Sequence, residues 1–138
     1  MEYKKSYKGF VIWFIVFLVL CFCCAIIPME DINLLTLLIY NMMTIGMAIL
    51  TWIIYKNEKI YWYTGLSYEE AKRASSEQRK KYAMRHFKRF AILAVAYVVY
   101  SIIAYCFTLP IGVSTTVVLI GMVGTAISTM NIKLEKTD

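Results

Sequence analysis

Charged residues are missing from three long stretches of the sequence. No Asp, Glu, Lys or Arg occurs in residues 9–29, 32–55 or 90–132, and the 138-residue chain is 60% hydrophobic. Soluble domains are closer to half apolar, and an apolar run of about 20 residues is typical of a membrane protein. The missing charge therefore excludes an ordinary soluble domain.

The uncharged stretches are long enough to cross a membrane. A helix with a rise of about 1.5 Å per residue needs about 20 apolar residues to span the hydrocarbon. We therefore expect an all-α, polytopic membrane protein with a single domain. Its predicted transmembrane helices cover residues 9–27, 32–55, 90–109 and 111–130.

Lys and Arg are missing from both short connections between the predicted spans. The first connection carries only Glu30 and Asp31, and the second carries no charge. All fifteen Lys and Arg residues lie elsewhere: three before the first span, ten in residues 56–89 and two in the C-terminal tail. Because Lys and Arg collect on the cytoplasmic side of membranes, we expect a multi-pass protein of the cell (inner) membrane with both termini in the cytoplasm.

Proline occurs only twice, and both prolines lie next to the short connections. Pro28 and Pro110 each follow a predicted span directly. Proline lacks the backbone N–H that a helix interior requires, so it separates one helix from the next. Connections this short predict two antiparallel hairpins that together form a four-helix bundle.

Residues 56–89 are predicted to form a cytosolic helical hairpin. Ser67 is followed by Glu70, and Ser75 by Gln78, in the pattern of two helix-capping boxes. We expect a short helix over about residues 67–74. A second helix should start near Ser76 and continue into the third span without a break.

The second of these helices begins with a polybasic run. Clusters of Lys and Arg beside a membrane span contact anionic lipid headgroups and fix the orientation of the chain. The basic residues could also pair with carboxylates of the same segment or dock a protein partner. The carboxylates are those of Glu58, Glu69, Glu70 and Glu77. Nucleic acid is a poor fit because the run lies against the bilayer. The candidate lipid-binding or partner-binding residues are Arg79, Lys80, Lys81, Arg85, Lys88 and Arg89.

The chain has one His, which limits the enzymatic chemistry that it can perform. A single His cannot build a multi-His metal site. Arg79 and His86 are spaced similarly to the Arg and His of HEPN-type ribonucleases, but we expect no supporting cytosolic helix beyond the predicted hairpin to build a cleft. No nucleotide-binding, zinc-protease or hydrolase motif is present. We therefore expect no enzymatic activity, no cofactor and no metal.

Three of the four cysteines lie in the first predicted span. Cys21 and Cys24 have redox spacing, and Cys106 should lie at the same end of the bundle. This set resembles the quinone-coupled disulfide-generating membrane oxidoreductases, which implies a thiol–disulfide activity for the three residues. Those enzymes carry cysteines in hydrated outer loops and have a second outer pair, whereas the short connections here contain no cysteine. Apolar packing is the interpretation that we favour.

Polar residues within the predicted spans form two sets. A buried amide without a partner costs several kcal/mol, so Asn41 should face the bundle or another protomer, with Tyr97, Tyr100 and Ser101 as a candidate polar cavity. Interhelical hydrogen bonding is the simpler reading, since no ionisable Asp, Glu, Lys, Arg or His lies in any span. The second set consists of small residues that permit close helix contact. Its members are Gly121, Gly124, Thr125 and Ser128.

One segment resembles small membrane proteins of Gram-positive bacteria that have not been characterised. Their shared pattern, a cytosolic Gly-x-Ser-x-Glu-Glu followed by Lys-Tyr, matches this chain at Gly65, Ser67, Glu69, Glu70, Lys81 and Tyr82. The resemblance covers about a fifth of the chain. It implies a hairpin between two spans and brings no activity with it.

These observations favour a non-enzymatic membrane protein that works by association. We expect a homo-oligomer or an accessory subunit of a larger membrane complex, in contact with anionic headgroups on the cytosolic side. The alternatives are a small oligomeric channel or exporter for a neutral or apolar solute, and a membrane thiol–disulfide oxidoreductase.

Overall fold

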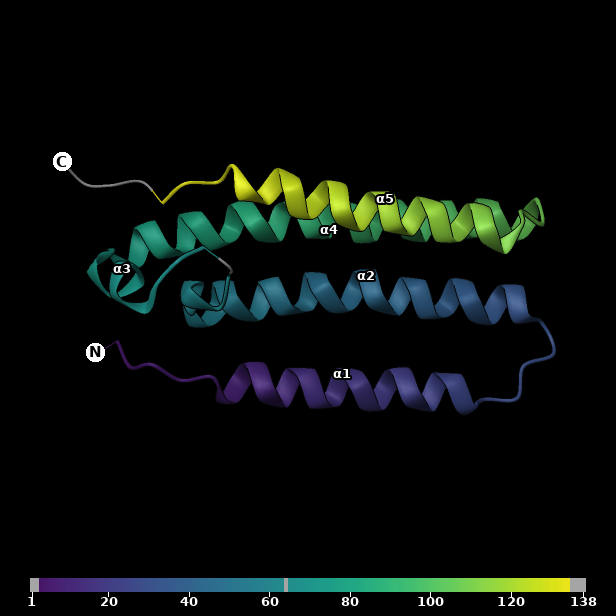
Figure 1. The fold of residues 1–138 in the computed structure, drawn as a ribbon, viewed down its shortest axis with the longest axis horizontal. Helices are drawn as coiled ribbons and strands as arrows, with labels where there is room; N and C mark the ends of the chain where they lie inside the picture. The colour runs from purple at the N-terminus through teal and green to yellow at the C-terminus, as the bar shows by residue number, and fades with distance from the viewer. Residues whose placement is uncertain (1–2, 64, 135–138) are drawn as a thin grey trace.

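The computed structural model describes residues 3–63 and 65–134, which contain helices and no strand. Figure 1 shows the long helices lying side by side, with the two ends of the chain at the same end of the bundle as α3. Within the described residues, four helices are long and apolar enough to cross a membrane. The elements are α1 (Lys8–Ile26), α2 (Ile32–Asn57), η1 (Ile60–Trp62, a 3-10 turn), α3 (Tyr68–Arg73), α4 (Ser76–Cys106) and α5 (Ile111–Met130).

The helix starts follow from local sequence. The Asp31 carboxylate accepts a hydrogen bond from the backbone N–H of Leu34 at 3.0 Å and so caps α2. Ser67 and Ser75 each form a complete capping box at the start of α3 and α4, with Glu70 and Gln78 as the reciprocal partners. The predicted break between two helices in this segment is therefore confirmed. So is the continuation of the second helix into the third apolar stretch.

The end of α4 differs from the predicted boundary at residue 109. The helix stops at Cys106, and Thr108 adopts a left-handed conformation with φ of 49°. The backbone N–H of Leu109 then donates to the Ala104 carbonyl at 2.9 Å. Proline disfavours the helical conformation in the residue that precedes it, so the chain leaves the helix before Pro110. This turn leads directly into α5.

Helices α2 and α4 form the centre of the bundle. From α2, Thr44, Ala48 and Thr51 turn toward the interior, and Ala48 packs with Phe90 and Ala94 of α4. Small side chains at these positions let the two backbones approach closely. Helix α5 lies on α4 and buries Ser114 and Val118 only, whereas α1, which is described throughout, buries none of its residues.

Helix α1 contacts α2 at a notch made by Gly46. A Cβ atom at Gly46 would overlap the ring of Phe17, which lies on α1 and stacks on Trp13 with ring centroids 5.1 Å apart. The Cys24 Sγ atom lies 3.9 Å from the Met42 Sδ atom, nearer to the connection between α1 and α2. The position of α1 therefore depends on a glycine that admits an aromatic ring.

Substituting Gly46 should displace α1. We expect Gly46→Val to push Phe17 out of the notch and to lower the free energy of unfolding by about 2 kcal/mol, as overpacking of a filled site does. The measurement is disulfide formation between Cys24 and Met42→Cys with the other cysteines replaced by Ala. Cross-linking should be efficient with Gly46 and weak with Val.

Gly112→Val provides the matched control, because no described atom beyond its chain neighbours and the nearby backbone of its own helix lies within 4 Å of a Cβ atom there. Met43→Cys, whose position is exposed, should cross-link poorly in either background. Equal cross-linking of Met42→Cys with Gly and with Val at residue 46 would contradict the notch.

Candidate functional site

Polar contacts gather at the end of the bundle that carries α3. We call residues 3–7, 58–63 and 65–82 the polar cap. The segment before α1 is held there by backbone and side-chain hydrogen bonds. The Ser6 N–H donates to the Tyr61 hydroxyl at 2.7 Å, and that hydroxyl donates to the Ser6 carbonyl at 2.8 Å. The Tyr68 hydroxyl donates to the Tyr3 carbonyl at 2.5 Å, so the N-terminal segment is tied to η1 and α3.

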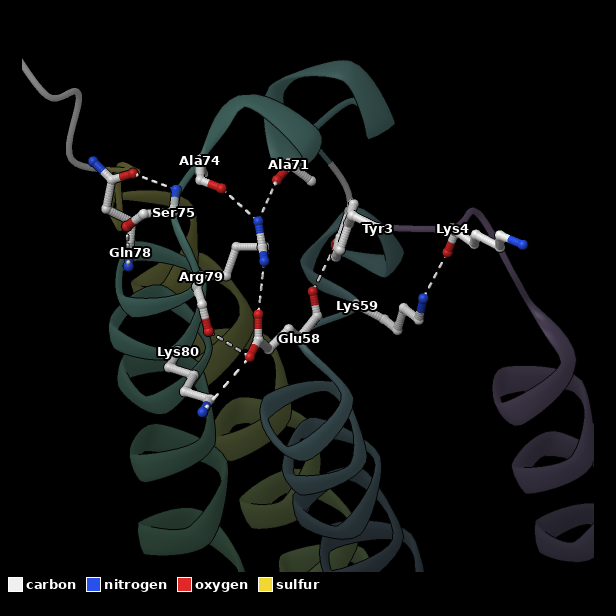
Figure 2. A network of polar contacts seen from close by, with 11 residues as sticks. Tyr3, Lys4, Glu58, Lys59, Ala71, Ala74, Ser75, Gln78, Arg79 and Lys80 are labelled. Atoms are coloured by element: carbon white, nitrogen blue, oxygen red, sulfur yellow. Dashed lines mark hydrogen bonds and ion pairs between the residues drawn. The ribbon is translucent and has the colours of Figure 1, made fainter. Parts of the chain in front are cut away.

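Glu58 is the centre of the polar cap (Figure 2). Its carboxylate accepts hydrogen bonds from Arg79 at 2.9 and 3.0 Å and from the Ser76 hydroxyl at 2.6 Å. The Lys80 ammonium lies 3.6 Å away. The Glu58 backbone carbonyl accepts a hydrogen bond from the Tyr3 hydroxyl at 2.6 Å. One residue thus joins the end of α2 to the start of α4 and to the N-terminal segment.

The charge of Glu58 is stabilised by these partners. Partial burial raises the pKa of the Glu58 carboxyl, but the hydrogen bonds from Ser76 and Arg79 and the charges of Arg79 and Lys80 outweigh it, so the pKa is lower than usual. Hydrogen bonds to an ionised group are shorter and stronger than neutral ones. The carboxylate is therefore ionised at neutral pH and serves as a fixed anion within the cap.

Arg79 faces inward, unlike the rest of the polybasic run. Its side chain is 12% exposed, its guanidinium lies 4.3 Å from the Tyr3 ring centroid, and it also donates to the Ala74 carbonyl. Lys80 is 53% exposed, and Arg89 is partly exposed. Of the six predicted contact residues, Arg79 therefore stabilises the cap, and those on the exposed surface are Lys80, Lys81, Arg85 and Lys88.

His86 is buried between aromatic rings at the base of the cap. Its ring stacks on Tyr63 with centroids 4.2 Å apart, and its Nδ1 atom lies 3.1 Å from the Tyr82 carbonyl oxygen. Burial lowers the pKa of His86, and the charge of Arg89 lowers it further against the opposing hydrogen bond to Tyr82. Arg79 binds Glu58 while His86 packs on Tyr63, so the two have different partners.

The predicted polar residues of the long helices come together between α2 and α4. The Asn41 amide donates to the Ser101 hydroxyl oxygen at 2.8 Å and to the Leu37 carbonyl at 2.9 Å. The Ser101 hydroxyl donates in turn to the Tyr97 carbonyl at 2.8 Å. Within this layer, Asn41 Oδ1 and the Tyr97 hydroxyl are buried and have no hydrogen-bond partner in the described part of the chain. Apart from those two atoms, the polar groups of this layer form hydrogen bonds within one chain.

Helix α5 contributes polar contacts that the sequence analysis did not include. Tyr40 and Thr115 share a hydrogen bond of 2.9 Å between their hydroxyls, and Tyr100 lies 3.2 Å from the Ser114 hydroxyl oxygen. The sequence feature that could have indicated this contact is Tyr40, a polar side chain beside Asn41 in an apolar stretch. Its partner, Thr115, is 75 residues away in the sequence. Sequence spacing alone gives no means of pairing them.

The four small residues predicted for helix contact have different surroundings. A Cβ atom at Gly121 would lie 2.8 Å from Leu93 Cδ1, so this glycine accommodates α4 of the same chain. At Gly124, no described atom beyond its chain neighbours and the nearby backbone of α5 lies within 4 Å of such a Cβ atom. The Ser128 hydroxyl donates to the Thr125 carbonyl at 2.7 Å. Gly124 is therefore the open member of the set.

The cysteines do not form a disulfide in the described part of the chain. Cys21 and Cys24 are partly exposed, and Cys23 and Cys106 are exposed. Within residues 3–63 and 65–134, no group of three or more His, Cys, Asp or Glu side chains could hold a metal ion. The structure places Cys24 against Met42 rather than against another cysteine.

The polar cap and the Asn41 layer are two places where polar side chains gather in the described chain. No protein-family model, curated protein or solved structure matches this sequence. The proposals that follow therefore depend on the residues of this chain and on physical chemistry.

Replacing Glu58 should weaken the cap in a pH-dependent way. We expect Glu58→Gln to lower the free energy of unfolding by about 2 kcal/mol at neutral pH, because Arg79 loses its charged hydrogen-bond partner. A carboxyl whose pKa is lowered on folding stabilises the fold above its ordinary value of 4.5. That stabilisation is lost as the pH falls through the lower pKa of the folded state.

The measurement is unfolding of both proteins in detergent from about pH 7 to about pH 3, where the two stabilities should converge. Glu69→Gln, at an exposed position of α3, removes the same charge and should change stability little. A constant difference between wild type and Glu58→Gln at every pH would contradict the ionic role.

Proposed function

We propose that the chain is an integral membrane protein with four spans in two antiparallel hairpins. In this arrangement α1, α2, the later part of α4 and α5 cross the cell membrane. The polar cap and both ends of the chain lie on the cytosolic side. Helix length and apolar composition support the spans, and the one-sided distribution of Lys and Arg supports the orientation.

Within the membrane, the protein works by association and has no catalytic activity of its own. It forms a homo-oligomer or serves as an accessory subunit of a larger membrane complex. The observation that carries this proposal is the open half of α5. This helix is described throughout, and after Val118 none of its residues is buried. Gly124 in that half has no described atom near a Cβ position.

The contrast between Gly121 and Gly124 supports the same conclusion. At Gly121, Leu93 of the same chain occupies the space next to the glycine, which supports a role for the small residues of α5 in helix contact. Gly124 lies about one turn further along the same helix. A second helix packed there gains close contact at little entropic cost, since small residues lose few rotamers. The hydrogen bonds of Asn41 and Ser101 lie within one chain, which favours association over a solute pathway through the interior.

The orientation can be tested with single cysteines in a background that lacks the four native ones. We expect a membrane-impermeant maleimide added to intact cells to label Glu30→Cys and not Lys72→Cys. Both positions are exposed, so accessibility depends on the side of the membrane. Opening the cells should make Lys72→Cys reactive, which controls for expression. Labelling of Lys72→Cys in intact cells would overturn the orientation.

Association can be tested by enlarging the open glycine. We expect Gly124→Ile to reduce the oligomeric fraction, or to release the larger partner, while insertion and thermal stability are retained. The measurement is the particle mass in native-like nanodiscs, with co-purifying chains identified. Gly112→Ile is the control, because that glycine is also free of described neighbours but lies at the start of α5. An unchanged mass distribution for Gly124→Ile would remove this face from the proposal.

A further inference from the structure

A hollow of about 670 Å³ lies where the polar cap meets the end of α5. Its volume falls within the range of about 300–1,000 Å³ that small-molecule sites occupy. Its wall draws on α3, the first turns of α4 and the chain that follows α5, which Figure 1 shows at one end of the bundle. The hollow is therefore built from two stretches that are distant in sequence, residues 65–82 and residues 130–134.

The wall of the hollow contains both apolar and cationic residues. Met130 and Leu134 supply apolar surface, and Met130, the last residue of α5, is 80% exposed. Arg73, the last residue of α3, and Lys133 supply positive charge. An exposed apolar surface next to two cations matches an amphiphile with an anionic head.

The position of the hollow agrees with such a ligand. Met130 ends the fourth span, so it lies at the membrane boundary in the orientation proposed above. Gln78, also in the wall, precedes Phe90 by twelve residues in α4, which is about 18 Å along the helix axis. Phe90 begins the apolar run of that helix. The hollow therefore extends from the membrane boundary to the cytosolic side.

The balance of charge also favours an anion. Of the described residues in the wall, Arg73 and Lys133 are cationic and Glu70 is anionic. A smaller hollow beside it is lined by Lys133 together with Lys81 and Arg85. Lys81, Arg85 and Glu70 have other interactions, so binding is assigned to Arg73 and Lys133. Guanidinium groups bind phosphate through paired N–H groups, and ammonium groups bind it as a point charge.

We propose that this hollow binds one anionic phospholipid of the cytosolic leaflet. Arg73 and Lys133 contact its phosphate, and Met130 and Leu134 contact the start of its acyl chains. This inference rests on the membrane orientation proposed above. A free phosphate would leave the apolar wall exposed to water, whereas a lipid covers it.

The test uses the full chain in a non-ionic detergent, titrated with dioctanoyl phosphatidylglycerol and observed by native mass spectrometry. We expect saturable binding of one lipid per chain. Arg73→Gln with Lys133→Gln should weaken binding about 30-fold, since each cation near an anionic lipid contributes about a 5-fold preference. Dioctanoyl phosphatidylcholine should bind much more weakly than phosphatidylglycerol.

Lys72→Gln with Lys88→Gln is the matched control, because it removes the same charge at exposed positions outside the wall. Met130→Trp, which fills the apolar side without changing charge, should also weaken binding. Equal weakening by the control pair would show general attraction to the basic surface and overturn the site. Glycerol phosphate that competes as well as the lipid would assign the hollow to a soluble anion and overturn the lipid.

The maleimide test of orientation separates this proposal from the one on which it rests. A chain with the expected labelling that binds no phosphatidylglycerol overturns the lipid site alone. A chain with Lys72→Cys labelled in intact cells overturns both, because the hollow then faces the other leaflet.

Discussion

The carboxylate of Glu58 is the contact on which the arrangement of the helices depends. It lies directly after α2 in a left-handed backbone conformation with φ of 56°, which ends the helix and turns the chain. From there it binds Arg79 of α4, while its carbonyl binds Tyr3 ahead of α1. One residue thus joins three segments at the end of the bundle, in addition to the packing of α2 on α4 and the hydrogen bonds of Ser6 and Tyr68. Because Arg79 is largely shielded from water, the pair is screened less than a surface pair would be.

Stability is unevenly distributed across the bundle. Helices α2 and α4 share a close interface lined by Ala48, Phe90 and Ala94, whereas α1 has no buried residue and relies on the Phe17 notch. In water such a helix would be unstable, but in hydrocarbon its exposed apolar side chains are already solvated. The cap then sets the position of α1 by fixing the segment before it. The polar contacts of the cap therefore compensate for the weak packing of α1 on the rest of the bundle.

Local features of the fold were predictable, and contacts across the chain were not. Ser67 with Glu70 and Ser75 with Gln78 predicted two helix starts because a capping box involves neighbours in sequence. The uncharged stretches predicted the long helices because their length and composition are also properties of consecutive residues. The partner of Arg79 was one of several glutamates until the turn at Glu58 selected it. The contact between Phe17 and Gly46 could not be predicted from the sequence, since the chain contains many aromatic residues and several glycines that could pair. The early end of α4 at Cys106 depends on how the Pro110 turn is closed.

The span of chain between Tyr3 and Arg79 has a consequence for biosynthesis. Both residues contact Glu58, so the cap cannot close until the ribosome has made the first two helices and the start of the third. If α1 crossed the bilayer in the reverse direction, Tyr3 would be separated from Glu58 by the full hydrocarbon thickness, about 30 Å. If the helices cross the membrane as proposed, the cap can close only after the early spans have been inserted in the right direction.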